Sequence, residues 1–229
     1  NVLEFYINHK RIKEDIFYIL DKNKYNFDEV ELLTYFILFL ERKDLDAEIK
    51  ASILDEVMKN PIYLGNNKPL DSKNYLYDLV DILPDLLKES NLNLRYSGAR
   101  ILEKILLYHE ILDYESNDII LRKLLDLYGD ETAGNEAIRL IKSIKPINHP
   151  WIKDELVKLL NGNNIIEKRN SILTLSELLS SEKEDNVNLY NPNDAYYKAI
   201  GLVVKLIKTS DSEEDRRVSF YFLSAVSHR

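Results

Sequence analysis

One short pattern recurs along this chain and constrains its fold more than any other feature. A small residue is followed three positions later by a bulky residue and seven positions later by an apolar one. The small residues are Ala51, Ala99, Ala137, Ser171 and Ser219. Positions 0, +3 and +7 share one face of an α-helix, and a small residue there lets two helices approach closely. The pattern therefore predicts five helices that pack through the same face.

Each of these helices follows another amphipathic segment, so the chain divides into pairs. We expect helix pairs at residues 27–59, 74–112, 115–145, 148–181 and 194–229, after an N-terminal helical cap at residues 1–26. No stretch alternates polar and apolar residues over the length of a strand, and six glycines and six prolines are few for a sandwich or barrel. The predicted fold is all-α, a single domain over residues 1–229, with a plain non-repetitive helical domain as the alternative. Because the sequence begins without Met and its last helix reaches Arg229, we expect a piece of a longer chain.

The spacing and detail of the pattern resemble HEAT repeats. The small residues are 48, 38, 34 and 48 positions apart, 42 on average, against roughly 40–47 for HEAT and armadillo units. The fullest copy reads Leu83-Pro84-x-Leu86-Leu87, then Asn93-x-Arg95, then Ala99-x-x-Leu102-x-x-Ile105. HEAT repeats carry a proline in the first helix, Asp or Asn at the turn and a basic residue entering the second helix. The resemblance covers residues 27–229 and implies a right-handed α-solenoid, a HEAT-like superhelix of about five helix pairs that serves as a binding surface and is seldom an enzyme.

Charge and residue usage exclude several classes of function. There are 31 basic and 39 acidic residues, a net charge of −8, which weighs against a dedicated nucleic-acid binder. The absence of cysteine excludes disulfides, thiolate metal sites and cysteine catalysis. No apolar run approaches the roughly 20 residues that span a bilayer. We expect an intracellular protein, in the cytoplasm or alternatively in the nucleus.

The search for catalytic and metal-binding motifs is negative. Gly129 and Gly134 have the spacing of a phosphate loop, but the Lys and Ser/Thr of that loop are missing and Asp130 would repel phosphate, so we interpret the segment as a turn and a helix start. The histidines at positions 9, 109, 149 and 228 fall in different helical units, which argues against a metal site. Trp151 is expected to pack at a helix start, with a binding anchor as the alternative. We therefore predict no catalytic residue, no metal and no cofactor.

Two features indicate where a partner could bind. The long polar loops Asn60–Lys73 and Glu182–Asn193 each join one pair to the next, and in a solenoid they would emerge on the same edge. Basic residues also recur on one face of the second helices, two positions before or five after the small residue. The predicted partner-binding residues are Lys104, Lys142, Arg169 and Arg217 at these positions, together with Arg139, which lies one turn from Lys142. If second helices line the concave face, these residues would form a basic ladder for an acidic or phosphorylated peptide; scattered solvated charge is the alternative.

These observations favour a non-enzymatic scaffold or adaptor that binds another protein through its concave face and edge loops. A co-chaperone or transport adaptor would be a specialised form of the same function. The alternative is a nucleic-acid-binding or DNA-repair protein on a HEAT-like frame, for which the charge balance is unfavourable.

Overall fold

The computed structural model describes residues 36–59, 73–107, 114–143, 150–182 and 187–229. Within these ranges residues 36–41 are helical, and nine further helices follow without any strand. They are α4 (Ala47–Lys59), α5 (Lys73–Leu86), α6 (Leu92–Leu107), α7 (Tyr114–Asp126), α8 (Ala133–Ser143), α9 (Trp151–Asn161), α10 (Ile165–Ser181), α11 (Ala195–Thr209) and α12 (Glu213–Ser227). The predicted cap at residues 1–26 and loop residues 60–72 lie outside the described residues.

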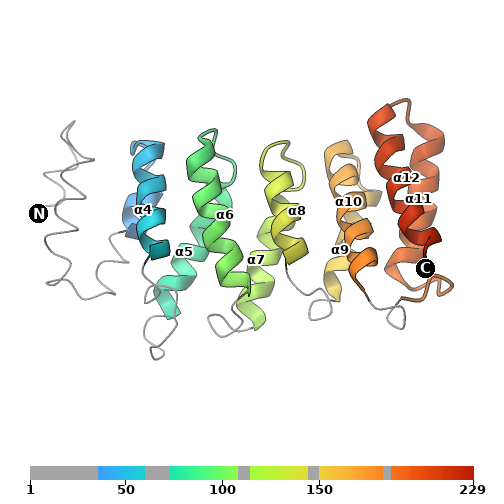
Figure 1. Cartoon of the computed structure of the whole chain (residues 1–229), viewed down its shortest axis with the longest axis horizontal. Coiled ribbons are helices and arrows are strands. Elements are labelled where there is room, and N and C mark those ends of the chain that lie inside the picture. Colours follow the sequence, from blue (N-terminus) through green and yellow to red (C-terminus); the bar gives the residue numbers. More distant parts are fainter. Residues whose placement is uncertain (1–35, 60–72, 108–113, 144–149, 183–186) are drawn as a thin grey trace, which may run out of the picture.

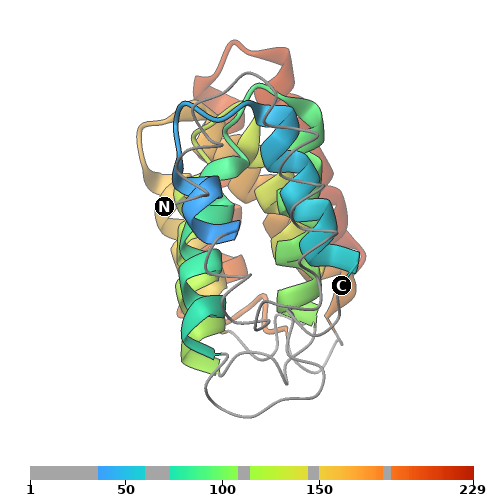
Figure 2. The same cartoon turned by 90° about the vertical axis from the view of Figure 1, so that its left-hand side faces the viewer.

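The helices stand side by side in an elongated row of pairs (Figure 1). An end-on view shows two layers (Figure 2). Helices α4, α6, α8, α10 and α12 form one layer, which we call the second-helix layer, and α5, α7, α9 and α11 form the first-helix layer. Within the pairs α5 packs against α6, α7 against α8, α9 against α10 and α11 against α12, and each helix of the second-helix layer packs against the next one in that layer. This is an α-solenoid of about five helix pairs, which confirms the predicted fold class and the resemblance to HEAT and armadillo repeats in architecture.

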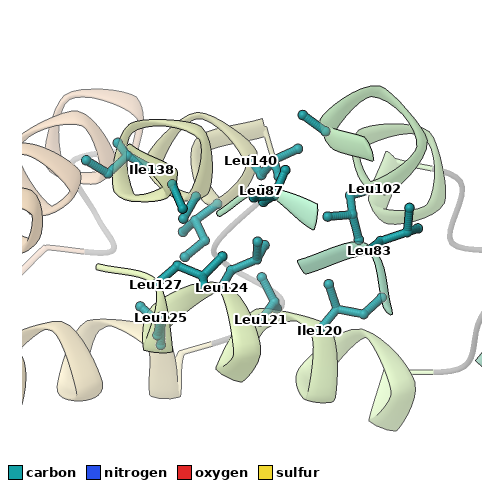
Figure 3. Packing of buried hydrophobic residues seen from close by; sticks show 14 of the residues in the cluster. Leu83, Leu87, Leu102, Ile120, Leu121, Leu124, Leu125, Leu127, Ile138 and Leu140 are labelled. Carbon is teal, nitrogen blue, oxygen red and sulfur yellow. The ribbon is translucent and has the colours of Figure 1, made fainter. Parts of the chain in front are cut away.

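The small residues of the repeated pattern face the core as predicted. All five are buried, and the residues three positions later are fully buried in every copy: Leu54, Leu102, Leu140, Thr174 and Phe222. At the seventh position Leu106 and Leu178 are buried, whereas Met58 and Val226 are partly buried against the core. Leucine and isoleucine side chains from both layers meet between the helices (Figure 3). The pattern thus marks the buried face of the helices in the second-helix layer.

Local chemistry explains where several helices begin and end. The side chains of Asn164, Asp194 and Ser212 cap α10, α11 and α12 by accepting backbone N–H groups of the first turn. Pro84 lies in the last turn of α5, which ends at Leu86. Directly after the helix the chain tightens through a bond from the Leu87 N–H to the Pro84 carbonyl.

Candidate interaction surface

The ladder residues of α8 are held by carboxylates of neighbouring helices. Arg139 donates to Glu103 of α6 at 2.8 Å and to Glu136 of its own helix at 2.9 Å. Burial alone would lower the pKa of Arg139, but the bonds to Glu136 and Glu103 outweigh it and raise that pKa. Lys142 pairs with Glu177 of α10 at 3.1 Å. Both cations therefore link adjacent copies.

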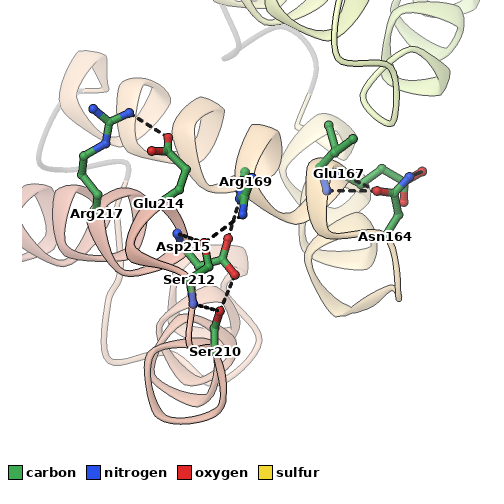
Figure 4. A network of polar contacts seen from close by, with 9 residues as sticks. Asn164, Glu167, Arg169, Ser210, Ser212, Glu214, Asp215 and Arg217 are labelled. Carbon is green, nitrogen blue, oxygen red and sulfur yellow. Dashed lines mark hydrogen bonds and ion pairs between the residues drawn. The ribbon is translucent and has the colours of Figure 1, made fainter.

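Arg169 occupies a still more enclosed position (Figure 4). Its Nε donates to Asp215 Oδ1 of α12 at 2.5 Å, and its Nη2 donates to Ser212 Oγ at 3.0 Å. The Asp215 side chain is only 2% exposed and also accepts a bond from Ser210 Oγ. Arg169 thus fastens α10 to the start of α12.

The other two ladder residues differ from these three. Arg217 is exposed and pairs with Glu214 one turn earlier in α12, at 2.7 Å. Lys104 lies half-buried near the end of α6, and no described carboxylate is within ion-pair distance of it. The five residues are therefore not a continuous row of free cations, because four of them already bind carboxylates. The sequence alone did not identify Glu103, Glu177 and Asp215, the carboxylates on neighbouring helices that bind Arg139, Lys142 and Arg169.

A groove on the same layer lies between α4 and α6. It encloses about 330 Å³, and its walls include Ser52, Asp55, Asn93, Tyr96 and Arg100. Tyr96 is 61% exposed, and the Arg100 guanidinium carbon lies 5.6 Å from the centre of its ring. Ser97 Oγ donates to Asp55 Oδ1 at 2.8 Å and joins the two walls. The groove therefore combines an exposed aromatic ring, a guanidinium and an amide.

These α6 side chains were not predicted as a site, although the sequence contains a signal. Asn93, Tyr96 and Arg100 follow one another at helical spacing on the face opposite the buried Leu94 and Ile101. Tyr and Arg are the residue types that dominate binding energy in protein interfaces. The predicted basic ladder was based on charge alone and therefore did not include Asn93, Tyr96 and Arg100.

A second cavity lies at the edge loop before α11. It encloses about 410 Å³ between loop residues 187–190, Ile200 of α11 and Val226 of α12. Tyr190, at 94% exposure, belongs to its rim. Loop residues 187–190 belong to the edge loop predicted at Glu182–Asn193, of which residues 183–186 lie outside the described residues.

Trp151 is a junction residue in the first-helix layer. Its Nε1 donates to Asp118 of α7 at 2.9 Å, and the Arg122 guanidinium lies 4.2 Å from its ring centre. Lys123 of α7 likewise bonds Asp81 of α5. Trp151 packs at the start of α9, as predicted, and joins two copies by a hydrogen bond and a cation–π contact.

The described residues show how the segment around Gly129 and one of the four histidines lie. Around Gly129 the chain turns, and the N–H groups of Thr132 and Ala133 bond to Asp130, so those donors are occupied. Among the described residues no group of three or more His, Asp or Glu side chains could hold a metal ion. His228 is exposed, while the other three histidines fall outside the described ranges. None of the described helices is both long and apolar enough to cross a bilayer.

Comparison with known proteins gives similarity of structure only. No family model and no curated protein matches the chain. An engineered protein of known crystal structure is similar at a TM-score of 0.41 and 18% identity, covering 85% of this chain and 79% of that one. A designed armadillo repeat protein is similar at 0.41 and 17%, covering 86% and 82%.

Proposed function

We propose that this chain is a non-enzymatic scaffold that binds a partner protein on the second-helix layer, centred on the groove between α4 and α6. The observation that carries the proposal is the exposed Tyr96, with Arg100 over its ring and Asn93 beside it. Such groups supply most of the energy of protein interfaces when they become buried. The packed helices form a contiguous surface, so a partner that binds Tyr96 and Arg100 can make further contacts along the row.

Lys104 belongs to the proposed surface, because it lies one turn beyond Arg100 on α6 and its ammonium group has no ion-pair partner in the described part of the chain. The four paired ladder residues contribute less to binding in this proposal. A partner carboxylate would have to displace a carboxylate that already binds each of them. Arg139, Lys142 and Arg169 therefore act mainly in holding copies together.

Site-specific photo-crosslinking in an extract of the source cells tests the proposal. A photoreactive phenylalanine at position 96 is expected to capture a protein that the same residue at position 158 does not. Lys158 is 70% exposed and lies on α9, in the other layer. The captured protein, once purified, should bind the intact chain. Tyr96→Ala should weaken that binding by about 2 kcal/mol, roughly thirty-fold.

The matched control is Lys158→Ala, which should leave the affinity within twofold. Equal affinity of the Tyr96→Ala and Lys158→Ala variants would exclude the groove as the site. If the chain shifts nucleic acid in a gel at low salt and Tyr96→Ala abolishes that shift, the nucleic-acid alternative is favoured instead.

A further inference from the structure

Helix α11 differs in charge from the rest of the described chain. It carries Lys198, Lys205 and Lys208, and it is the one described helix of the nine named above without Asp or Glu. The protein as a whole has a net charge of −8. A basic helix on an acidic protein is a local feature that the fold itself does not require.

The three lysines share the outward face of the first-helix layer. The buried face of α11 contains Ala199, Val203 and Leu206, and the lysines lie on the opposite side at helical spacing. All three are exposed, as is Tyr197 beside them. In the described ranges no carboxylate lies within ion-pair distance of these ammonium groups, whereas nine other cations of the described chain are paired. We call Lys198, Gly201, Lys205 and Lys208 the α11 stripe.

Gly201 lies in the middle of the stripe without a structural reason to be glycine. A Cβ added there would meet no atom within 4 Å, so alanine would fit the fold. Glycine is less favourable than alanine inside a helix. Its useful property at this position is the absence of a side chain, which lets another backbone approach the helix surface closely.

The stripe continues into a small polar cavity. The cavity encloses about 160 Å³ between the α9–α10 turn and the second half of α11, and its lining includes Asn161, Asn163, Lys168, Lys205 and Thr209. The nearby Glu167 carboxylate accepts a hydrogen bond from the Asn164 amide. Two ammonium groups and two amides around one space suit a carboxylate.

From these observations we propose that the α11 stripe binds an extended acidic segment of a partner protein, whose backbone crosses Gly201 and one of whose carboxylates enters the Lys168–Lys205 cavity. Charge complementarity identifies the occupant. Lys198 and Lys208 are ten residues apart, about 15 Å along the helix. An extended chain rises roughly 3.3 Å per residue, so about five residues match the stripe. A longer polyanion is repelled by the net negative charge of the rest of the protein.

Fluorescence anisotropy with a rhodamine-labelled hexaglutamate peptide tests this site on the full chain at low salt. The triple variant Lys198→Glu, Lys205→Glu, Lys208→Glu should bind the peptide at least tenfold more weakly than the unmodified chain. The control Lys43→Glu, Lys88→Glu, Lys158→Glu has the same net charge and should lose no more than threefold. Circular dichroism establishes that both variants are folded.

Gly201→Ala separates folding from binding. The variant should unfold at a temperature about 2 °C higher, because alanine favours the helix. It should nevertheless bind hexaglutamate at least threefold more weakly, since its methyl group keeps the peptide backbone away. Unchanged affinity would overturn the proposed path across Gly201.

Three other results would overturn the proposal as a whole. They are no binding of hexaglutamate, an equal loss of binding in the two triple variants, and tighter stripe-dependent binding of a six-nucleotide single-stranded DNA or of anionic phospholipid vesicles. Tyr96→Ala should not affect hexaglutamate binding, so the α11 site and the proposed groove between α4 and α6 can fail independently.

Discussion

Arg169 and Asp215 are separated by 46 residues in the chain, yet the guanidinium of one donates to the almost fully buried carboxylate of the other. The pair joins α10 to α12, and Ser210 and Ser212 complete its hydrogen bonds. A buried carboxylate is tolerated only when donors surround it. The arrangement makes this contact a structural one and yields the first prediction.

Arg169→Ala should lower the free energy of unfolding by about 2–3 kcal/mol, because it leaves the buried Asp215 carboxylate without its cationic partner. Arg217→Ala removes the exposed ion pair with Glu214 within α12 and should lower the free energy of unfolding by less than about 0.5 kcal/mol. Urea unfolding of both variants measures the difference. Equal effects would show that the Arg169 contact is as solvated as the Arg217 contact.

Ser171→Ala and Ser219→Ala should each raise the free energy of unfolding by about 1 kcal/mol. Both hydroxyls are buried and find no hydrogen-bond partner in the described part of the chain, and a buried hydroxyl without a partner is destabilising. The three other copies already have alanine at this position. Thermal and urea unfolding check the prediction, and a loss of stability would mean that these hydroxyls are bonded in solution.

Gly134→Ala should destabilise the fold by about 1–3 kcal/mol. An added Cβ would lie 2.5 Å from Nδ2 of Asn170, which donates to the Tyr128 carbonyl at 2.8 Å, so that buried bond would be strained or lost.

Gly98→Ala is the control for this prediction, since the nearest atom to its Cβ would be Leu86 Cβ at 3.6 Å, an ordinary contact. Helix propensity alone would stabilise both variants, so unfolding curves that shift in opposite directions identify the steric effect.

Asp130 should contribute a pH-dependent part of the stability. The N–H of Ala133 bonds to its carboxylate and lowers the pKa below the usual 3.8; slight burial opposes this, and the Thr132 N–H adds to it. Because the folded pKa is lower than the unfolded one, the stabilisation is complete above pH 3.8 and is lost as pH falls through the folded pKa.

Asp130→Ala should therefore cost about 1 kcal/mol at pH 7, as for other helix caps, and progressively less below about pH 4. Asp130→Asn keeps the accepting oxygen without the charge and should cost less than Asp130→Ala at pH 7. Because it also lacks the titrating carboxyl, its cost relative to the unmodified chain should fall by the same amount between pH 7 and pH 3. Urea unfolding at pH 7 and pH 3 measures both. A cost of Asp130→Ala that does not change with pH would rule out the ionised cap.

The sequence predicted the buried side of the structure better than its polar side. Residues such as Ala99 and Leu102 recur at helical spacing, and burial follows from that spacing because each copy packs in the same way. The carboxylate that faces a given cation depends on how neighbouring copies are offset. Glu177 binds Lys142 and Asp215 binds Arg169 across 35 and 46 residues, and no periodicity within a copy specifies either contact.

The candidate sites show the same division. Tyr96 and Arg100 are recognisable in the sequence as neighbours on a helix, but the groove beside them also needs Asp55 of α4, and the distance between α4 and α6 sets its width. The three lysines of α11 are equally visible in the sequence. Whether a carboxylate of the described residues reaches them depends on how α9 and α12 pack around that helix, and none does.

The contacts between adjacent copies differ from one junction to the next. Ser97 meets Asp55 at one, Arg139 meets Glu103 at the next, Lys142 meets Glu177 after that, and Arg169 meets Asp215 at the last. The apolar pattern is the same in every copy and would let any copy stack on any other, whereas each of these polar contacts matches only one neighbouring copy. The polar contacts therefore specify the order of the copies. A chain in which two copies were exchanged would keep its apolar stacking but would place mismatched charges at each altered junction.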